Sequence, residues 1–415
     1  MKQRQAVTKV TAKRYQQAGK KEKKQILDEF CRTTGYHRCY ARWVLRHQGQ
    51  RVQIKPTLVL EGDVQQRQRR TKARIYDDRV AQALVQLWEL LDYLCGKRLV
   101  AILPEIVAKL EQFEELRLEA ETRSKLLQLS AATADRILQP ERRKHSLRGR
   151  GRTTPGSLLK HQIPIRTFAD WNEQRPGFVE LDLVAHDGGI GVGDYAQTLD
   201  MTDICTGWTE TIAVPNKAQV WVFEAINKAR RRLPFPLLGI DCDNGSEFIN
   251  HELYRYCVAQ AITFTRTRPY RKNDNCYVEQ KNYSVVRRAV GYQRFDTDKE
   301  GLLLNQLYDT LRLYTNFFQP VMKLKSKERR GSQVKKYYDA PLTPYQRVLD
   351  SSHVAPADKE RLRLQYQQLN PAALKREISR LQKLLFTLAT SKPKKVSNRP
   401  GRKAKPLRIR PMPNL

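Results

Sequence analysis

The chain has 415 residues, of which 77 are Lys or Arg and 43 are Asp or Glu, so its formal net charge is +34 and its isoelectric point is near 10. This length accommodates about two to four domains with cores of their own. A charge excess of this size opposes compaction unless a polyanion neutralises it, so the composition favours nucleic acid as the partner. No apolar run approaches the roughly 18–20 residues that span a bilayer, and the opening MKQRQAVTKV has no apolar signal segment, so we expect no membrane partner.

The seven cysteines are odd in number and scattered, with no C-x-x-C pair. This pattern predicts reduced thiols in a cytoplasmic protein associated with the nucleoid, and no zinc site. Cys31 and Cys39 lie near His37 and His47, but their spacing fits none of the usual zinc arrangements.

Residues 1–70 are expected to form a DNA-binding domain. We expect 1–20, which are polar and basic, to be partly disordered. Apolar residues then recur at helix spacing, Gly35 indicates a turn, and a second helix is predicted over 38–46. This second helix combines an apolar face of Tyr40, Ala41, Val44 and Leu45 with a basic stripe of Arg38, Arg42 and Arg46. The arrangement is typical of a helix-turn-helix whose second helix enters the major groove, and a helical hairpin with a solvated face remains the alternative.

Residues 71–140 are predicted to form a second helical DNA-binding module, in which the helix of SAATADRILQ has Ser130 as its N-cap. Residues 141–167 follow as a basic linker rich in Gly, Pro, Ser and Thr, which cannot bury a core. Three linker arginines are candidate DNA contacts: Arg148, Arg150 and Arg152.

Residues 168–295 alternate between strand and helix patterns. FVELDLV, YAQTLDM and TGWTETIAV read as consecutive strands, and helix, strand, helix, strand and helix follow. This order predicts an α/β core, a mixed five-stranded sheet with helices on both faces. Beyond it we expect a C-terminal helical and basic region over 296–390, with a helical pair interrupted at Asn370–Pro371, and a disordered basic tail over 391–415.

Three acidic residues of the predicted core lie at positions where their carboxylates could form one catalytic site. Asp182 lies within the first strand, Asp243 ends a later strand before the Asn244–Gly245 turn, and Glu279 lies on the last helix. Carboxylates brought together in this way repel one another unless divalent cations with a preference for oxygen lie between them. Other acids nearby are Glu180, Asp187, Asp241 and Glu247, of which Asp241 is the likeliest alternative to Asp243 because the two share a strand face.

The series E-L-D-L-V, D-N-G-S-E-F and V-E-Q-K-N, with 35 residues between the second and third acids, resembles the catalytic core of D-D-E transposases and retroviral-type integrases, which are ribonuclease H-like. The flanking regions match the layout of bacterial insertion-sequence transposases, and no His-His-Cys-Cys module precedes the core as it does in retroviral integrases. The resemblance implies that Asp182, Asp243 and Glu279 are catalytic and bind two Mg²⁺ or Mn²⁺ ions, without ATP.

The reaction implied by the resemblance is cleavage at the ends of a mobile element, followed by attack of the freed 3′-hydroxyl on target DNA. Joining two ends in step implies a homo-oligomer on DNA, which the mass of an end complex would reveal. Further candidate DNA contacts flank Glu279: Arg268, Arg271, Lys272, Lys281, Arg287 and Arg288, with Tyr270 and Tyr277 as stacking candidates or core residues. Two rival readings are a DNA-binding regulator with a structural acidic triad and a nuclease of the same superfamily.

Overall fold

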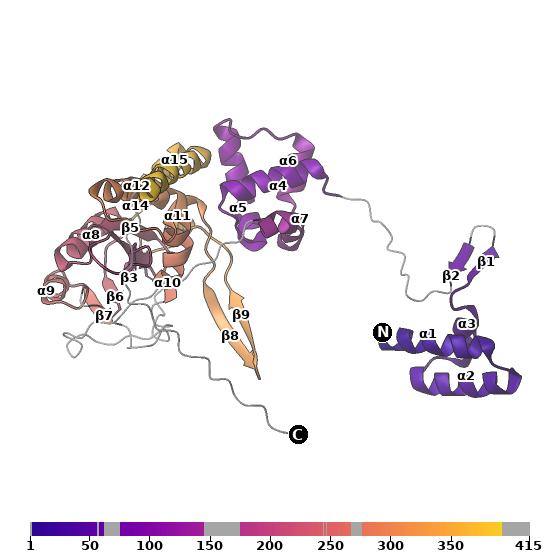
Figure 1. Cartoon of the computed structure of the whole chain (residues 1–415). Coiled ribbons are helices and arrows are strands. Elements are labelled where there is room, and N and C mark those ends of the chain that lie inside the picture. The colour runs from indigo at the N-terminus through magenta and orange to yellow at the C-terminus, as the bar shows by residue number, and fades with distance from the viewer. Residues whose placement is uncertain are drawn as a thin grey trace, which may run out of the picture. The chain divides into compact units, whose positions relative to one another are not determined.

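The computed structural model describes residues 2–55, 58–61, 75–144, 175–243, 245, 247–266 and 276–391. The chain divides into two compact units, Met1–Ile75 and Tyr76–Leu415 (Figure 1). The predicted basic linker from residue 145 and the tail from residue 392 lie outside the described residues.

The first unit is a three-helix domain followed by a hairpin. Its elements are α1 (Lys2–Gln17), α2 (Lys20–Thr34), α3 (Arg38–His47), β1 (Arg51–Lys55) and β2 (Leu58–Glu61). Gly35 ends α2 in the left-handed conformation with φ of 69°, so the predicted helix, glycine turn and helix are confirmed. The expected disorder of residues 1–20 is wrong, because α1 contributes Ala12 to the core around Phe30. Tyr40 is also exposed, although it was placed on the apolar face.

The second unit contains the predicted sheet. Its core elements are β3 (Phe178–Ala185), β4 (Gln197–Asp203), β5 (Thr209–Val214), α8 (Gln219–Arg232), β6 (Gly239–Cys242), α9 (His251–Ala259), β7 (Thr263–Arg266), α10 (Cys276–Lys281), the π-helical segment η2 (Asn282–Arg287) and α11 (Arg288–Val290). The strand order is β5-β4-β3-β6-β7. β3, β4 and β5 pair antiparallel, whereas β6 and β7 run parallel to β3, so the expected mixed five-stranded sheet is confirmed.

Helices cover both faces of this sheet, and the alternation of side chains on β3 explains why. Leu181 belongs to the apolar cluster that includes α8 and α9, whereas Val184 belongs to the cluster that includes η2 and α12 (Asp298–Phe318). The face with Val184 also carries the acidic residues of β3, so α10 and η2 cover a polar area.

The helices that precede the core, α4 (Asp78–Leu90), α5 (Gly96–Gln112), α6 (Ala120–Leu127) and α7 (Ala131–Lys144), share the second unit with the sheet. They pack against the C-terminal helices α14 (Pro356–Gln368) and α15 (Pro371–Ser391). The ammonium of Lys109 donates to the carbonyl of Gln367 at 2.8 Å, and Arg376 binds both carboxylate oxygens of Glu115 at 2.7 Å. Polar and apolar contacts therefore join the two ends of this unit.

The C-terminal region contains the predicted helical pair, with α14 and α15 separated at Leu369–Asn370, and α13 (Pro344–Asp350) before it. The sequence did not predict the β-hairpin of β8 (Leu324–Arg330) and β9 (Gln333–Tyr338). Among the described residues, no helix combines the length and apolar character needed to cross a membrane.

Candidate active site

The three acids of the sequence motif come from two adjacent strands and the helix that covers them. β3 and β6 are parallel neighbours, with Leu181 opposite Cys242, so Asp182 and Asp243 follow paired residues toward the same edge of the sheet. Glu279 lies on α10, which packs on β3 and β4. Carboxyl ends of parallel strands are where active sites of α/β folds gather.

The protonation behaviour of Asp182 shows that the acids influence one another. Burial, and then the carboxylates of Asp243 and Glu279, raise the pKa of Asp182 to about 7, while hydrogen bonds from Leu183 N and Asn282 act in the opposite direction. Burial and Glu247 raise the pKa of Asp243, whose Oδ1 accepts a hydrogen bond from Gly245 N at 2.9 Å. These acids form a site that disfavours full ionisation without a counter-charge.

Gly245 allows the turn after Asp243 to close tightly. A Cβ at this position would lie 2.7 Å from the carboxyl carbon of Glu247 and 2.9 Å from Oδ1 of Asp243. A larger residue would therefore displace the Asp243 carboxylate or its neighbour.

Asn282 is a site residue that the motif did not assign. It follows Glu279 by three residues and begins the π-helical segment η2, and its Nδ2 donates to Oδ2 of Asp182 at 2.6 Å. Its Oδ1 is buried without a hydrogen-bond partner. The spacing of three residues on a helix was the available signal, because it places Asn282 on the face of Glu279.

Asp200 on β4 lies directly opposite Asp182 in the sheet register. It is fully buried, accepts a hydrogen bond from Thr202 and, through burial, has a raised pKa. Lys281 is its electrostatic partner, and burial lowers the pKa of that ammonium. No sequence pattern singled out Asp200, because alternation along β4 alone does not reveal the register of β4 with β3.

The alternative acids occupy different environments. Glu180 and Asp241 are fully buried and lie opposite each other on β3 and β6. Oε2 of Glu180 accepts a hydrogen bond from Val278 N at 2.8 Å, which holds the start of α10 on the sheet. Thr265 donates to Asp241 from the neighbouring strand β7. Asp241 is therefore an interior residue of β6, whereas Asp243 directly follows the end of that strand.

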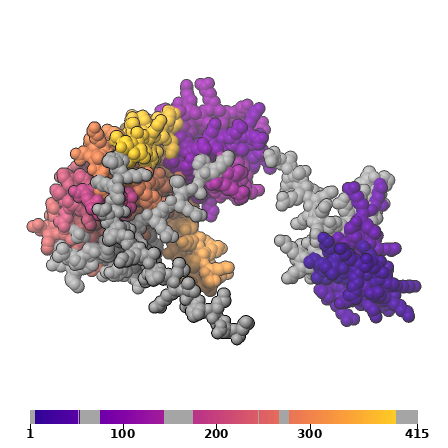
Figure 2. All heavy atoms as spheres, in the orientation of Figure 1, coloured from indigo at the N-terminus to yellow at the C-terminus, as the bar shows by residue number. Residues whose placement is uncertain are grey.

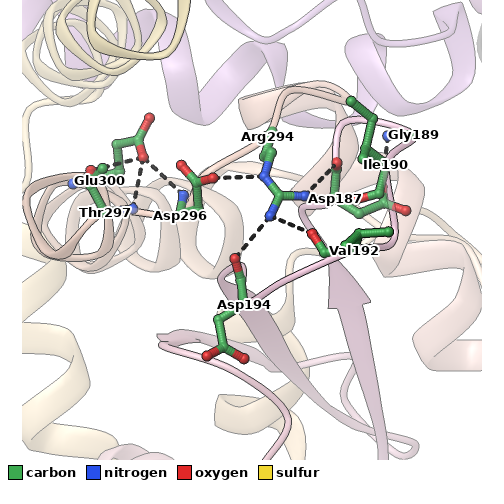
Figure 3. Close-up of polar contacts among 9 residues, drawn as sticks. All are labelled: Asp187, Gly189, Ile190, Val192, Asp194, Arg294, Asp296, Thr297 and Glu300. Carbon is green, nitrogen blue, oxygen red and sulfur yellow. Dashed lines mark hydrogen bonds and ion pairs between the residues drawn. The ribbon is translucent and has the colours of Figure 1, made fainter. Parts of the chain in front are cut away.

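The segment that follows β3 is held by one arginine (Figure 3). The guanidinium of Arg294 donates to the carbonyls of Asp187, Ile190, Val192 and Asp194, and pairs with the carboxylate of Asp296 at 2.7 Å. Asp296 N in turn donates to Glu300 at the start of α12. Arg294 thus fixes the chain at the end of the strand that carries Asp182.

The candidate DNA contacts fall into three groups. Arg38, Arg42 and Arg46 are exposed on α3, and Arg38 also pairs with Asp28. Lys281 is only 6% exposed, and its assignment as a DNA contact stays a prediction; Arg287 is half-buried and donates to Ala185 O at 2.8 Å. Arg288 is exposed and donates to Asp92 O. Five further candidates lie outside the described residues: Arg148, Arg150, Arg152, Arg271 and Lys272; the same is true of Arg268 and Tyr270.

The donor chemistry of the site suits a hard divalent ion, because its side chains offer carboxylate oxygens with raised pKa values. Among the described residues, no three His, Cys, Asp or Glu side chains are arranged to hold a metal ion. Glu279 is exposed, whereas Asp182 and Asp243 are partly buried on the sheet. The residues therefore fit a divalent cation by chemistry, and coordination by all three stays a prediction.

The strand order, the mixed pairing and the helices on both faces define an α/β domain built on a mixed five-stranded sheet. The chain is 42% identical over 334 residues to the uncharacterized protein y4rM of Sinorhizobium fredii (strain NBRC 101917 / NGR234), a match that covers 80% of this chain and 91% of that protein. The chain belongs to the same family as y4rM.

No known family model matches the chain. Solved structures with similarity to it include the catalytic core domain of BIV integrase, with 18% identity, 43% of this chain and 96% of that chain covered, and a TM-score of 0.29. Another is the HTLV-2 integrase catalytic core domain in complex with magnesium, with 17% identity, 35% and 91% covered, and a TM-score of 0.27.

Proposed function

We propose that this protein is a D-D-E DNA transposase that binds the ends of a mobile element, cleaves them and joins their 3′-hydroxyls to target DNA. The observation that carries the proposal is the placement of Asp182 and Asp243 on adjacent parallel strands, with Glu279 on the covering helix and the pKa of Asp182 raised to about 7 by burial and by the other two acids. A cation bound between these carboxylates at the ends of the strands would offset their mutual repulsion.

In the proposed reaction, Asp182, Asp243 and Glu279 would hold Mg²⁺ or Mn²⁺, which supplies Lewis-acid activation of a phosphodiester. Asn282 keeps the Asp182 carboxylate in a fixed orientation through its 2.6 Å hydrogen bond. Arg294 holds the segment after β3, and Glu180 holds α10 by accepting from Val278 N. These contacts position the catalytic acids before DNA arrives, which reduces the reorganisation needed in the transition state.

The proposal predicts the behaviour of three near-isosteric variants, Asp182→Asn, Asp243→Asn and Glu279→Gln. Each should reduce strand cleavage and strand transfer at least about 10³-fold, because each removes a charge that balances the cation, while binding to duplex DNA is retained. The substrate is a labelled duplex from the DNA that flanks the coding region, where the proposal expects short inverted repeats, incubated with Mg²⁺ and target DNA.

The matched control is Asp187→Asn. Asp187 is a nearby acid whose Oδ1 accepts from Gly189 N at 3.0 Å, a bond that an asparagine oxygen preserves. The control should keep near-normal activity. Equal product yields from wild type and the three variants would leave the acids with a structural role, as in a DNA-binding regulator. A nuclease of the same superfamily would give fragments without joined products.

A further inference from the structure

The hairpin of β8 and β9 extends away from the helices beside it (Figure 1), and its spheres stand out from the face of the protein drawn in Figure 2. Residues 325–336 are all exposed. They include one acid, Glu328, and six basic residues: Lys325, Lys327, Arg329, Arg330, Lys335 and Lys336. An isolated two-stranded hairpin is at best marginally stable in water, so this hairpin depends on its contacts with the rest of the unit.

The base of the hairpin is anchored firmly to the rest of its unit. Lys323 N donates to the Asp339 carboxylate at 2.6 Å, and that carboxylate pairs with Arg347 at 2.8 Å. The ammonium of Lys323 also donates to Cys205 O, in the turn between β4 and β5, at 2.8 Å. The hairpin therefore has a defined direction relative to the sheet.

The two faces of the hairpin carry different cross-strand pairs. On one face Glu328 lies opposite Lys335 and accepts a hydrogen bond from the Tyr337 hydroxyl at 3.1 Å, while the Lys335 ammonium lies 4.8 Å from the Tyr337 ring centre. On the other face Lys327 lies directly opposite Lys336. Like charges opposite each other across antiparallel strands are destabilising.

The face with the paired lysines continues into a cavity beside the catalytic helix. The cavity has a volume of about 320 Å³, within the roughly 300–1,000 Å³ of ligand pockets. It lies between the hairpin and α10 and is lined in part by Lys323, Lys327, Lys336, Tyr338, Tyr277 and Gln280. Tyr277 and Gln280 flank Glu279 in the sequence, so the cavity borders the segment that carries the third acid.

We propose that the Lys327–Lys336 face of the hairpin binds the sugar-phosphate backbone of double-stranded DNA, with a phosphate group seated in the cavity beside α10. Two ammonium groups that face each other across the strands attract backbone phosphates, whose negative charge offsets their mutual repulsion. The surface rests on the proposed function, because it would bring the duplex to the helix of Glu279.

The test compares Lys327→Thr/Lys336→Thr with wild type in the full chain. Threonine favours strands and removes the like-charge pair, so the melting temperature of the variant should be unchanged or higher. Affinity for a labelled mixed-sequence duplex of about 40 base pairs is measured by fluorescence anisotropy over a range of salt concentrations. The slope of log affinity against log salt should become shallower by about 2, because each phosphate contact contributes about 0.9.

The matched control is Lys335→Thr, which removes a charge from the same strand on the opposite face. Its salt slope should stay at the wild-type value. The inference is overturned if the double variant keeps the wild-type slope, or if Lys335→Thr flattens the slope by at least half as much as the double variant, since either result removes the distinction between faces.

This outcome is separable from the proposed function. A double variant with an unchanged salt slope, in a protein whose Asp182→Asn variant has lost strand transfer, rejects the hairpin surface alone. A wild-type protein that makes no joined products but loses slope on the double substitution rejects the transposase and keeps the hairpin as a DNA-binding surface.

Discussion

The groups around the Asp182 carboxyl come from separate parts of the chain, and together they determine its pKa. Asp200 lies across the strand pair from it, Asn282 donates to it from the π-helical segment, and Asp243 and Glu279 repel its negative charge. Burial and this repulsion raise the pKa of Asp182 to about 7. A divalent ion bound at the proposed site would therefore compete with this proton for the same oxygens near neutral pH.

This competition predicts that Mg²⁺ binding depends on pH. Below pH 7 the metal must displace the proton of Asp182, so its apparent affinity should fall by up to about tenfold per pH unit, and above pH 8 it should level off. Titration calorimetry in two buffers of different ionisation enthalpy counts the protons released, which should approach one per protein at pH 6 and fall toward zero at pH 8.5. Asp187→Asn should retain this dependence, and an affinity that is constant from pH 6 to 8 would contradict it.

The sequence predicted the positions of these acids only where a local pattern indicates them. Strand alternation indicated Asp182, the turn after the strand indicated Asp243, and the helix pattern indicated Glu279. Asp200 escaped prediction because its relation to Asp182 is a register between strands, which no local pattern encodes. The burial of Lys281 could not be predicted, because a basic residue on an amphipathic helix is expected to be solvated until its buried acidic neighbour is known.

At the scale of elements, α12 protects the edge of the sheet at β5. Asn316 accepts from Thr209 N and donates to Thr209 O, each at 2.9 Å, and Asn305 bonds both backbone groups of Ala213 at 3.1 and 3.0 Å. Two amides on one helix thus take the place of a further strand, which leaves those backbone groups satisfied. The helix lies in the helical region predicted over 296–390, but its role at the sheet edge depends on tertiary contacts and could not be predicted.

The edge contact predicts a large effect from Asn316→Ala. The substitution leaves the buried N–H and C=O of Thr209 without their partner, so the free energy of unfolding should fall by about 2–4 kcal/mol. Asn227→Ala is the matched control, because its Nδ2 bonds only the Phe223 carbonyl of its own helix; it should change stability by less than about 0.5 kcal/mol. Chemical denaturation of the two variants measures the difference, and equal values would mean that β5 does not depend on the amide.

At the scale of the whole molecule, the helices before and after the sheet belong to one packed unit. Composition suggested separate segments over 71–140, 168–295 and 296–390, since a basic stretch interrupts the sequence between the first two. The structure instead joins α5 to α14 through Lys109 and Gln367, and Glu115 to α15 through Arg376. Contacts between residues more than 200 positions apart leave no periodic trace in either segment, which explains why the sequence alone did not reveal this packing.

These contacts predict which fragments fold. A fragment of residues 76–391 retains every element of the second unit and should unfold in one cooperative transition, within about 3 °C of the corresponding transition in the full chain. A fragment of residues 168–295 keeps the five strands and all three acids but lacks α12, so the backbone groups of Thr209 and Ala213 lose the amides of Asn316 and Asn305. It also loses Phe317 and Phe318, which are each 1% exposed in the second unit. Thermal unfolding followed by circular dichroism should therefore show no cooperative transition for 168–295, together with aggregation through the uncovered edge. A sharp transition in this fragment, close to that of 76–391, would show that the sheet is an independent domain and that α12 adds little to its stability.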